Sequence, residues 1–404
     1  MSVLRLRDLR LLVAAVGLSS FGDFVLWVPL ALHIEAATGS PLAVSAFFLA
    51  LFGPVVALGG PAGRVADRVE NARLLWTVSL AQAAVVGAMA LATGSLAATL
   101  ALTVLLGIGV AISQPAEFAL VPAAVGEQRI AEANGMVESA RYVGMTAGPL
   151  VGGVLAAAGM LEAALIIDAA TFAAVAAAAA AMRARRHPRA VAAVAGDRGR
   201  SRDAVAFLTA NRVLRVTLTA AVAALLFFSI SIAAEVFYVT DVLRAGEAAY
   251  GVLLACWTLG MVAGAIGLGS RVPPVALPAA ALAAVAVQGA GIATAAAAGV
   301  LWAAFAGFTL GGIAHGAKNV VLRTLIHQRV PEALRGRGFA AYNAARNGAE
   351  LGALGAAGVL IGAIGAQPAL LLAGAVPLAI GAASLLLLTP AMPIRRTADA
   401  PLDA

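Results

Sequence analysis

The chain has 404 residues, of which 62% are apolar and only 12% are charged, and its mean hydropathy is +0.96. Soluble domains are about 45–50% apolar and about 25% charged, so this composition argues strongly against a water-soluble enzyme. The net charge of +7 comes almost entirely from arginine, because Lys318 is the only lysine. The single cysteine, Cys256, excludes an intrachain disulfide.

Long apolar runs, broken by charges, prolines and glycines, predict membrane-spanning helices. The apolar core of a bilayer requires about 20 such residues per helix. The first run lacks a small-residue cleavage site, so we interpret it as a retained helix rather than a signal peptide. The predicted fold is an all-α integral membrane protein with twelve spans, at about 9–33, 42–63, 73–92, 96–118, 133–157, 160–182, 214–240, 248–270, 275–297, 300–325, 338–362 and 368–390.

Arginines in the short loops predict the orientation of these spans. If there are twelve, all of the loop arginines except Arg244 lie on one side, which the positive-inside rule assigns to the cytoplasm. We therefore expect a multi-pass protein of the cytoplasmic (inner) membrane with both termini in the cytoplasm. The arginines on that side are Arg5, Arg7, Arg10, Arg64, Arg68, Arg73, Arg129, Arg271, Arg329, Arg335, Arg337, Arg395 and Arg396.

One long, arginine-rich connection divides the chain into two sets of six spans. The predicted units are an N-terminal bundle (1–182), a cytoplasmic basic linker (183–213), a C-terminal bundle (214–390) and a cytoplasmic tail (391–404). Residues 203–215 have apolar positions at helical spacing and could form an amphipathic helix on the membrane surface; a flexible basic linker is the alternative. The halves echo each other at an offset of about 205 residues, for example at Arg141 and Arg346, which indicates a duplicated six-helix unit.

The loop after the second span contains a charged motif that begins Gly63-Arg-Val-Ala-Asp67-Arg68. It resembles the Gly-x-x-x-Asp-Arg-x-Gly-Arg-(Lys/Arg) loop of the major facilitator superfamily. Glu70 replaces the second glycine of that pattern, and Arg73 is what remains of its basic cluster. The resemblance implies two pseudo-symmetric six-helix bundles and a transport function.

The physical interpretation of this motif is a cytoplasmic latch. A carboxylate is stabilised at a helix N-terminus, so Asp67 could dock on the start of the eleventh span in an outward-facing state. Arg68 could pair with Glu117 at the end of the fourth span. The alternative is a solvated, positively charged loop.

The fifth span carries a second motif of glycines with one proline. Glycines at every fourth position share one helix face and permit close packing, and a proline inside the span should kink it. A general packing face would explain the glycines but not the proline beside a glycine pair. The motif resembles that of proton-coupled exporters in the same superfamily, which implies export; its residues are Gly135, Gly144, Gly148, Pro149, Gly152 and Gly153.

Shorter stretches elsewhere narrow the resemblance. Gln114-Pro115-Ala116 and the segment through Arg335-Gly336-Arg337 are similar to the twelve-helix drug:proton antiporter branch, which includes macrolide and siderophore exporters. The resemblance covers nearly the whole chain and implies fold and transport better than it implies the substrate.

Ionisable residues inside membrane spans are costly and usually serve a function. Asp23 lies midway along the first span, where loss of hydration disfavours its charged form, and we expect it to be the main protonation site. A structural hydrogen-bonding role is the alternative. Arg346 and Glu350 are one turn apart and can pair, either as a neutral structural pair or as part of proton coupling. Lys318 could pair with Glu350 or Glu235.

The low aromatic content, 5%, predicts a substrate cavity lined mainly by aliphatic and small residues. Four aromatic residues could still offer stacking surfaces, although core packing is the alternative for each of them. The candidate cavity residues are Phe24, Trp27, Phe47, Arg141, Glu235, Trp257, His315 and Lys318.

The predicted function is a monomeric, proton-coupled exporter of small amphipathic compounds that works by alternating access. We expect no metal and no cofactor. The sequence contains no phosphate-binding motif that would indicate use of ATP. A proton symporter, a nontransporting receptor or scaffold, and a membrane-embedded enzyme are the alternatives. The last of these lacks a catalytic constellation in the sequence.

Overall fold

The computed structural model describes residues 6–185 and 197–388, and it confirms the all-α class, because these residues form helices and no strands. The α-helices are α1 (Arg7–Thr38), α2 (Pro41–Arg68), α3 (Asn71–Met89), α4 (Leu96–Val125), α5 (Ile130–Ala157), α6 (Leu161–Ala181), α7 (Asp197–Ala210), α8 (Arg212–Phe228), α9 (Ser231–Phe237), α10 (Glu247–Gly267), α11 (Leu277–Ala298), α12 (Leu301–Arg329), α13 (Glu332–Ile364) and α14 (Ala366–Leu388).

Ten helical segments of the described chain are long and apolar enough to cross a bilayer. Two further helices, α5 with 28 residues and α12 with 29, are equally long and pack among them, α5 against α1 and α12 against α10 and α11. Both carry charged residues, such as Arg141 in α5 and Lys318 in α12, which reduce their mean hydropathy. The predicted count of twelve spans therefore depends on these two helices.

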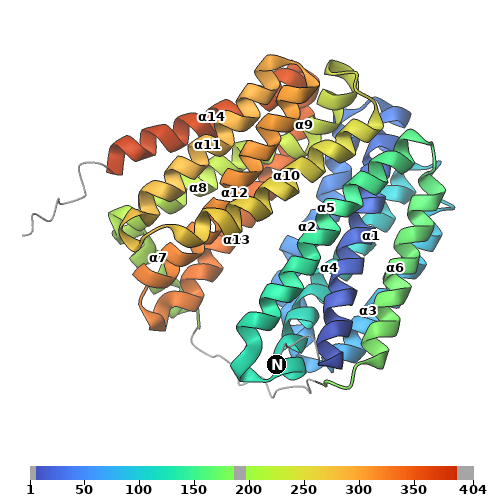
Figure 1. Cartoon of the computed structure of the whole chain (residues 1–404), viewed down its shortest axis with the longest axis horizontal. Helices are drawn as coiled ribbons and strands as arrows, with labels where there is room; N and C mark the ends of the chain where they lie inside the picture. Colours follow the sequence, from blue (N-terminus) through green and yellow to red (C-terminus); the bar gives the residue numbers. More distant parts are fainter. Residues whose placement is uncertain (1–5, 186–196, 389–404) are drawn as a thin grey trace, which may run out of the picture.

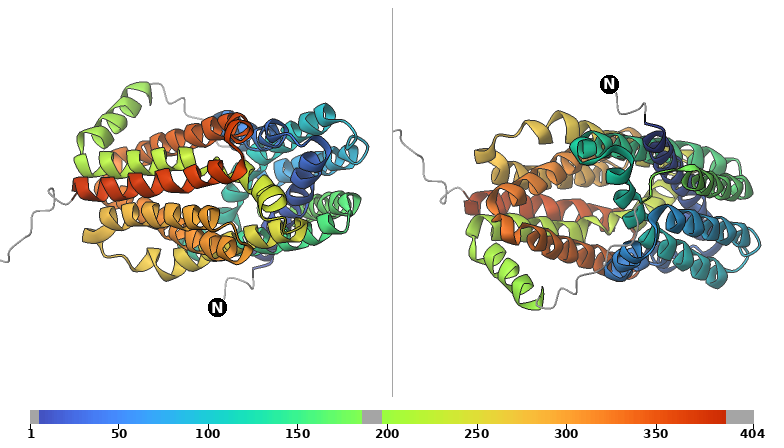
Figure 2. Two further views of the ribbon diagram at one scale, coloured as in Figure 1. Left: turned by 90° about the horizontal axis from the view of Figure 1, so that it is seen from above. Right: turned by 90° about the horizontal axis from the view of Figure 1, so that it is seen from below.

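The helices form two bundles, α1–α6 and α8–α14, with α7 at the outer edge of the second (Figures 1 and 2). The end of the predicted linker is helical, and α7 packs against α13 and α8. Most of the basic segment, residues 186–196, and the predicted tail, residues 391–404, lie outside the described residues.

The turn between α1 and α2 shows how local sequence sets the helix ends. Gly39 adopts a left-handed conformation, with φ of 57°, and its N–H donates to the carbonyl of Glu35 at 2.7 Å. The Ser40 hydroxyl accepts from the N–H of Ala43, and Pro41 occupies the first position of α2, where its missing N–H costs nothing. A two-residue turn thus reverses the chain.

The contacts that join the two bundles lie towards one end of the molecule. We call the end at which α1 begins and α6 ends the linker end, and the opposite one the far end. At the far end Gly358 of α13 lies so close to α2 that a Cβ there would be 2.7 Å from Leu42 Cα. The Thr240 hydroxyl donates to Glu35 at 3.3 Å, also at the far end. The two bundles diverge towards the linker end in Figure 1, so the molecule is closed at the far end.

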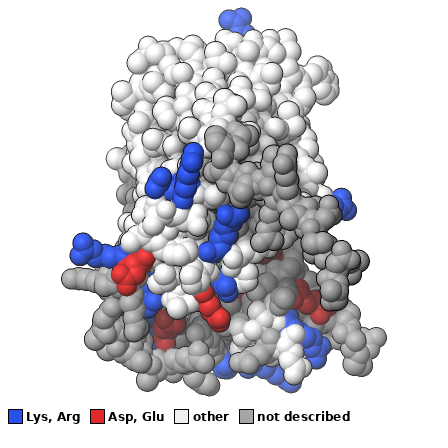
Figure 3. Space-filling view, turned by 90° about the vertical axis from the view of Figure 1, so that its left-hand side faces the viewer, with Lys and Arg blue, Asp and Glu red and all other residues white. Residues whose placement is uncertain are grey.

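Charged side chains gather towards the linker end of the molecule. Figure 3 shows one outer face of the C-terminal half, on which the coloured side chains lie mainly towards the lower end. The far-end portion of that face is largely uncharged, as expected for a surface in contact with lipid tails. This distribution agrees with the grouping of arginines in the sequence.

The predicted seventh span, 214–240, is not one continuous helix. It divides into α8 and α9 around Ser229 and Ile230, and it ends in a π-helical turn over Tyr238–Val242. The sequence did not indicate this break, because residues 214–240 are apolar enough overall to be assigned to one span, and apolarity alone does not distinguish a straight span from a broken one.

Candidate functional site

A cavity of about 250 Å³ lies between the two halves. Helices α1, α2 and α5 form one wall, and α8, α9, α10, α12 and α13 form the other. The lining residues are Phe24, Trp27, Val28, Phe48, Phe52 and Met145 from the N-terminal half, and Leu225, Phe228, Ser229, Ile232, Glu235, Tyr250, Leu254, Trp257, Thr258, His315, Arg346 and Glu350 from the C-terminal half.

The N-terminal wall is apolar and largely aromatic. The rings of Phe24 and Trp27 have centroids 4.8 Å apart, and Trp27 meets Phe52 edge to face at 5.7 Å. The expectation of a mainly aliphatic cavity is therefore wrong, because a small number of aromatic residues is concentrated here. Phe47, by contrast, is fully buried in the core and does not line the cavity.

The C-terminal wall combines an aromatic cluster with all of the ionisable side chains that line the cavity. Phe228 stacks on Trp257 with centroids 5.0 Å apart, and the His315 ring lies 5.3 Å from Trp257. Arg346 and Glu350 both line the cavity, but within the described residues no ion pair of 4.0 Å or less joins them. The predicted one-turn pair is thus open, and both groups can face an occupant of the cavity.

Lys318 does not line the cavity, and its expected pairing with Glu350 or Glu235 is not formed. Its ammonium group is buried behind the wall, where it donates to Gln288 Oε1 of α11 at 2.6 Å and lies 3.5 Å from His315 Nδ1. The neighbouring helix α11 thus supplies the nearest oxygen acceptor, which the spacing of charges along the sequence does not reveal.

A second polar cluster lies inside the N-terminal half, apart from the cavity. Arg141 of α5 pairs with Glu117 of α4 at 3.0 Å and approaches Glu138 at 3.6 Å. The predicted partner of Glu117 was Arg68, which is exposed at the end of α2. Glu117 instead points into the bundle, so Arg141 belongs to this cluster and not to the cavity lining.

Asp23 joins this cluster from α1. Its carboxyl group interacts electrostatically with Glu117 and Arg141 on one side and with Asp168 of α6 on the other. Asp168 is buried and accepts a hydrogen bond from the Thr171 hydroxyl. The carboxyl groups of Asp23, Glu117 and Glu138 thus lie near one guanidinium group in the interior of the bundle, and α6 adds Asp168 beside Asp23.

The glycine and proline motif of the fifth predicted span lies in α5 and packs against two different helices, α1 and α10. We call it the α5 motif. Gly144, Gly148 and Gly152 pack on α1: a Cβ on Gly144 would lie 2.5 Å from the carbonyl oxygen of Gly17. The neighbouring face crosses to the other half, where Gly153 and Pro149 contact Gly251 of α10. A hydrogen bond of 3.2 Å between Thr146 and Thr258 continues this contact towards the cavity. Gly135 has no such neighbour.

The loop motif after α2 occupies the linker end. Asp67, Arg68 and Arg73 are exposed, and a Cβ on Gly63 would meet no atom within 4 Å. Glu70 accepts a hydrogen bond from the N–H of Ala72 at 3.0 Å and so caps α3. It also pairs with Arg185 at 3.7 Å. A glycine at this position could form neither contact, which accounts physically for this departure from the family pattern.

Sequence reasoning missed Ser229. Its hydroxyl is buried at the break between α8 and α9, lines the cavity, and has no hydrogen-bond partner among the described residues. A buried hydroxyl without a partner is unfavourable, so it is available to an occupant of the cavity. Since the break itself was not predicted, no sequence signal singled out this residue.

A family model described as Major Facilitator Superfamily matches residues 12–353. No curated protein sequence matches the chain. Among solved structures, the nucleoside transporter NupG has a TM-score of 0.73 at 14% identity, over 93% of this chain and 99% of that one. A bacterial homologue of the iron transporter ferroportin in its inward-facing state scores 0.69 at 16% identity, over 94% and 100%. An outward-facing structure of a ferroportin homologue scores 0.60 at 16% identity, over 94% and 98%.

Proposed function

Because the chain belongs to the major facilitator superfamily, we propose that it is a secondary active exporter that exchanges small amphipathic compounds for protons across the cytoplasmic membrane. The observation that carries this proposal is the cavity between the halves, which both bundles line and which is closed at the far end. A site between two halves is what alternating access requires.

The two walls of the cavity support an amphipathic substrate. An apolar or aromatic portion would lie against Phe24, Trp27 and Phe52, while a polar portion would face Glu235 and Arg346. The Ser229 hydroxyl offers a further hydrogen bond. Ligand sites commonly combine such apolar walls with a few polar groups that orient the ligand.

We place proton coupling at the cluster around Asp23. Burial of a charge without a partner is costly, and Arg141 is already engaged by Glu117. A proton on Asp23 removes that cost, and deprotonation restores it. Arg346 and Glu350 are the second pair of groups that we assign to coupling, because they line the cavity and are free to respond to an occupant.

Direction and sidedness rest on three features. The arginine-rich linker end faces the cytoplasm in this proposal, so the structure is open inward, in agreement with its greater likeness to the inward-facing ferroportin homologue. The α5 motif forms the closed far-end contact, in line with its resemblance to exporters. Asp67 and Arg68 would latch the linker end in the opposite state.

The test is transport by the purified protein, which we propose acts as a monomer without a cofactor, in liposomes with an imposed proton gradient. A panel of fluorescent lipophilic dyes provides the substrates, and a pH-sensitive dye reports proton movement. We expect the dye to move in the direction opposite to the protons. We expect Asp23→Asn to abolish the proton-driven movement of the dye. Glu162→Gln, at an exposed carboxylate in the first turn of α6 at the far end, is the matched control and should transport normally.

Three outcomes would contradict the proposal. Dye movement in the same direction as protons would indicate a symporter, and undiminished transport by Asp23→Asn would remove that residue from coupling. Absence of any substrate-dependent proton movement across a broad panel of dyes would favour a receptor or scaffold.

A further inference from the structure

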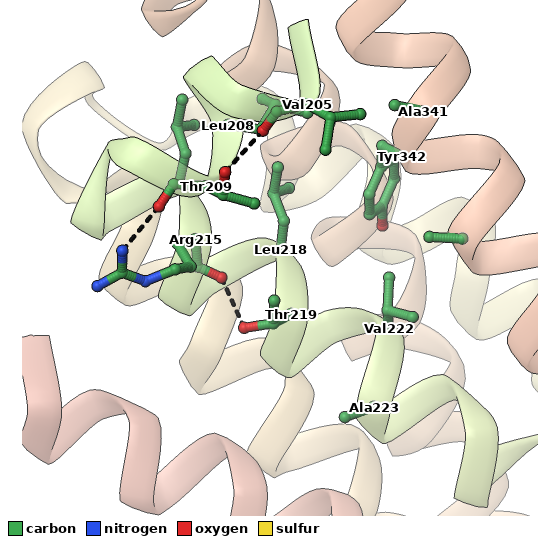
Figure 4. Close-up of a pocket in the computed structure, with 12 residues that line it drawn as sticks. Val205, Leu208, Thr209, Arg215, Leu218, Thr219, Val222, Ala223, Ala341 and Tyr342 are labelled. Carbon is green, nitrogen blue, oxygen red and sulfur yellow. Dashed lines mark hydrogen bonds between the residues drawn. The ribbon is translucent and has the colours of Figure 1, made fainter. Parts of the chain in front are cut away.

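A cleft of about 430 Å³ lies on the outer side of the C-terminal half, between α7, α8 and α13 (Figure 4). Its walls are mainly aliphatic: Leu208 comes from α7, Leu218 and Val222 from α8, and Ala341 from α13. Arg215 contributes the one charged side chain, and its guanidinium donates to the carbonyl of Thr209 at 2.7 Å. The cleft is thus an apolar slot with a cation at its edge.

A smaller hollow of about 130 Å³ lies between α12 and α13, and unlike the apolar cleft it is polar and basic. It is lined by two guanidinium groups, from Arg323 and Arg346, and by the amides of Asn319 and Asn343. Among the described residues no carboxylate lines either space. Paired guanidinium groups with neighbouring amide donors and no acid are suited to an anion such as a phosphate.

Tyr342 lines both spaces, so the apolar slot and the basic hollow adjoin each other along α13. An apolar slot that leads to an anion site matches a molecule with an aliphatic chain and an anionic head. We propose that this site binds an anionic phospholipid, with one acyl chain in the cleft and the phosphate at Arg323 and Arg346.

Charge complementarity identifies a bilayer lipid as the occupant. The cleft lies at the edge of the bundle beside α7, and its own charged residue, Arg215, is exposed. On α7 the exposed Arg202 is next to the exposed Asp203, so the net positive charge at the cleft comes from Arg215. Basic groups beside an amphipathic helix attract anionic headgroups. A lipid at the membrane surface can reach such a peripheral slot directly.

This site goes beyond the proposed transport function, because it is a lipid site outside the central cavity. It is nevertheless linked to that cavity. Tyr342, Arg346 and Glu350 follow each other at every fourth position of α13, and Arg346 lines both the basic hollow and the cavity. A phosphate at Arg346 therefore changes the charge at the polar wall of the cavity.

The experiment uses the full chain in nanodiscs of phosphatidylcholine that contain a photoactivatable phosphatidylglycerol, with its diazirine in the acyl chain. After irradiation, labelled peptides are mapped by mass spectrometry. We expect the label on α8 near Val222 and on α13 near Ala341. Arg323→Gln should reduce labelling about tenfold, as expected for the loss of a charge-assisted contact. Arg329→Gln, at an exposed arginine of the same helix that lines neither space, should leave labelling unchanged.

A second variant tests the cleft itself. Ala345→Phe fills the slot from α13 and should abolish labelling while the protein still elutes as a single species from a sizing column. The proposal would be overturned if a phosphatidylcholine probe labelled the protein as strongly as the phosphatidylglycerol probe does. It would also be overturned if the Arg323→Gln variant were labelled as strongly as the unaltered protein. Unlabelled cleft peptides in the unaltered protein would overturn it as well, and would mean that another chain or segment fills the slot. Labelling needs neither a substrate nor a proton gradient, so its failure is distinct from failure of transport.

Discussion

The contact between α5 and α10 provides the sharpest test of how the protein changes conformation. A Cβ on Gly153 would lie 3.0 Å from Gly251 Cα, whereas carbon atoms pack at about 3.5–4.0 Å. Gly153→Ala must therefore separate the two helices by about 0.5–1 Å. Overpacking of this kind costs about 1–3 kcal/mol, and only conformations in which the far end is closed bear that cost. Since about 1.4 kcal/mol changes a population tenfold, we expect the fraction that is open at the far end to rise about fivefold to a hundredfold.

Gly152 provides a matched control beside it. A Cβ there would also lie 3.0 Å from its nearest neighbour, but that atom is the carbonyl oxygen of Phe24 in the same half. Gly152→Ala strains the packing of α5 on α1 in every conformation, so it should reduce stability without changing which end is open. The two variants differ by one position and carry similar strain.

Accessibility of a cysteine in the cavity measures the shift. Leu254→Cys, in a protein in which Cys256 has been replaced by serine, places a thiol in the cavity lining. A membrane-impermeant maleimide is then added from either side of sealed vesicles. We expect Gly153→Ala to increase labelling from the far-end side and Gly152→Ala not to. Equal labelling of the two variants, or no change for Gly153→Ala, would refute the reasoning.

Three further predictions follow from packing and charge. Glu117→Ala removes the 3.0 Å partner of the Arg141 guanidinium and leaves only the longer contact with Glu138, so it should lower the stability to thermal unfolding in detergent by about 1.5–3 kcal/mol. Adding Arg141→Ala should restore part of the loss, and no recovery in the double variant would contradict the pairing. Trp257→Ala removes a ring from the cavity wall. For an aromatic dye it should raise the KM of transport by several-fold to about tenfold, with a smaller effect on the maximal rate. An unchanged KM would place the substrate elsewhere. The new Cβ of Gly22→Ala would overlap side chains of α6, so this variant should reduce the yield of folded protein from membranes severalfold. Gly53→Ala, whose Cβ would have no atom within 4 Å, should not reduce it. Equal yields would show that α1 and α6 can separate freely.

The sequence was most informative where one physical rule decides the outcome. The length of apolar runs determines which segments can span a bilayer, and ten helical segments meet this condition. The seventh expected span divides into α8 and α9, and the expected count of twelve depends on α5 and α12, which have the length but not the apolarity. The four-residue spacing of Gly144, Gly148 and Gly152 places them on one face, and they do pack closely on a neighbour. It does not identify that neighbour as α1, nor does it indicate that Gly153 contacts the other half.

Ion pairs and cavity walls could not be predicted in the same way, because they depend on which helix faces meet in space. Glu117 lies on α4 with Arg141 of α5 as its partner, and Lys318 donates to Gln288 of α11. Charge alone could not distinguish these partners from Arg68 or Glu350. Likewise, an overall aromatic content says nothing about where the rings gather, and they gather around the cavity.

The unequal walls of the cavity have a consequence for release. The N-terminal half supplies only apolar contacts, whereas the C-terminal half supplies every ionisable side chain that lines the space. An amphipathic molecule in this cavity would therefore be held fully only while both bundles surround it. As the bundles part at either end, it must give up one class of contact while keeping the other. The affinity of the cavity for that molecule then falls because of the opening movement itself, and release requires no further conformational change.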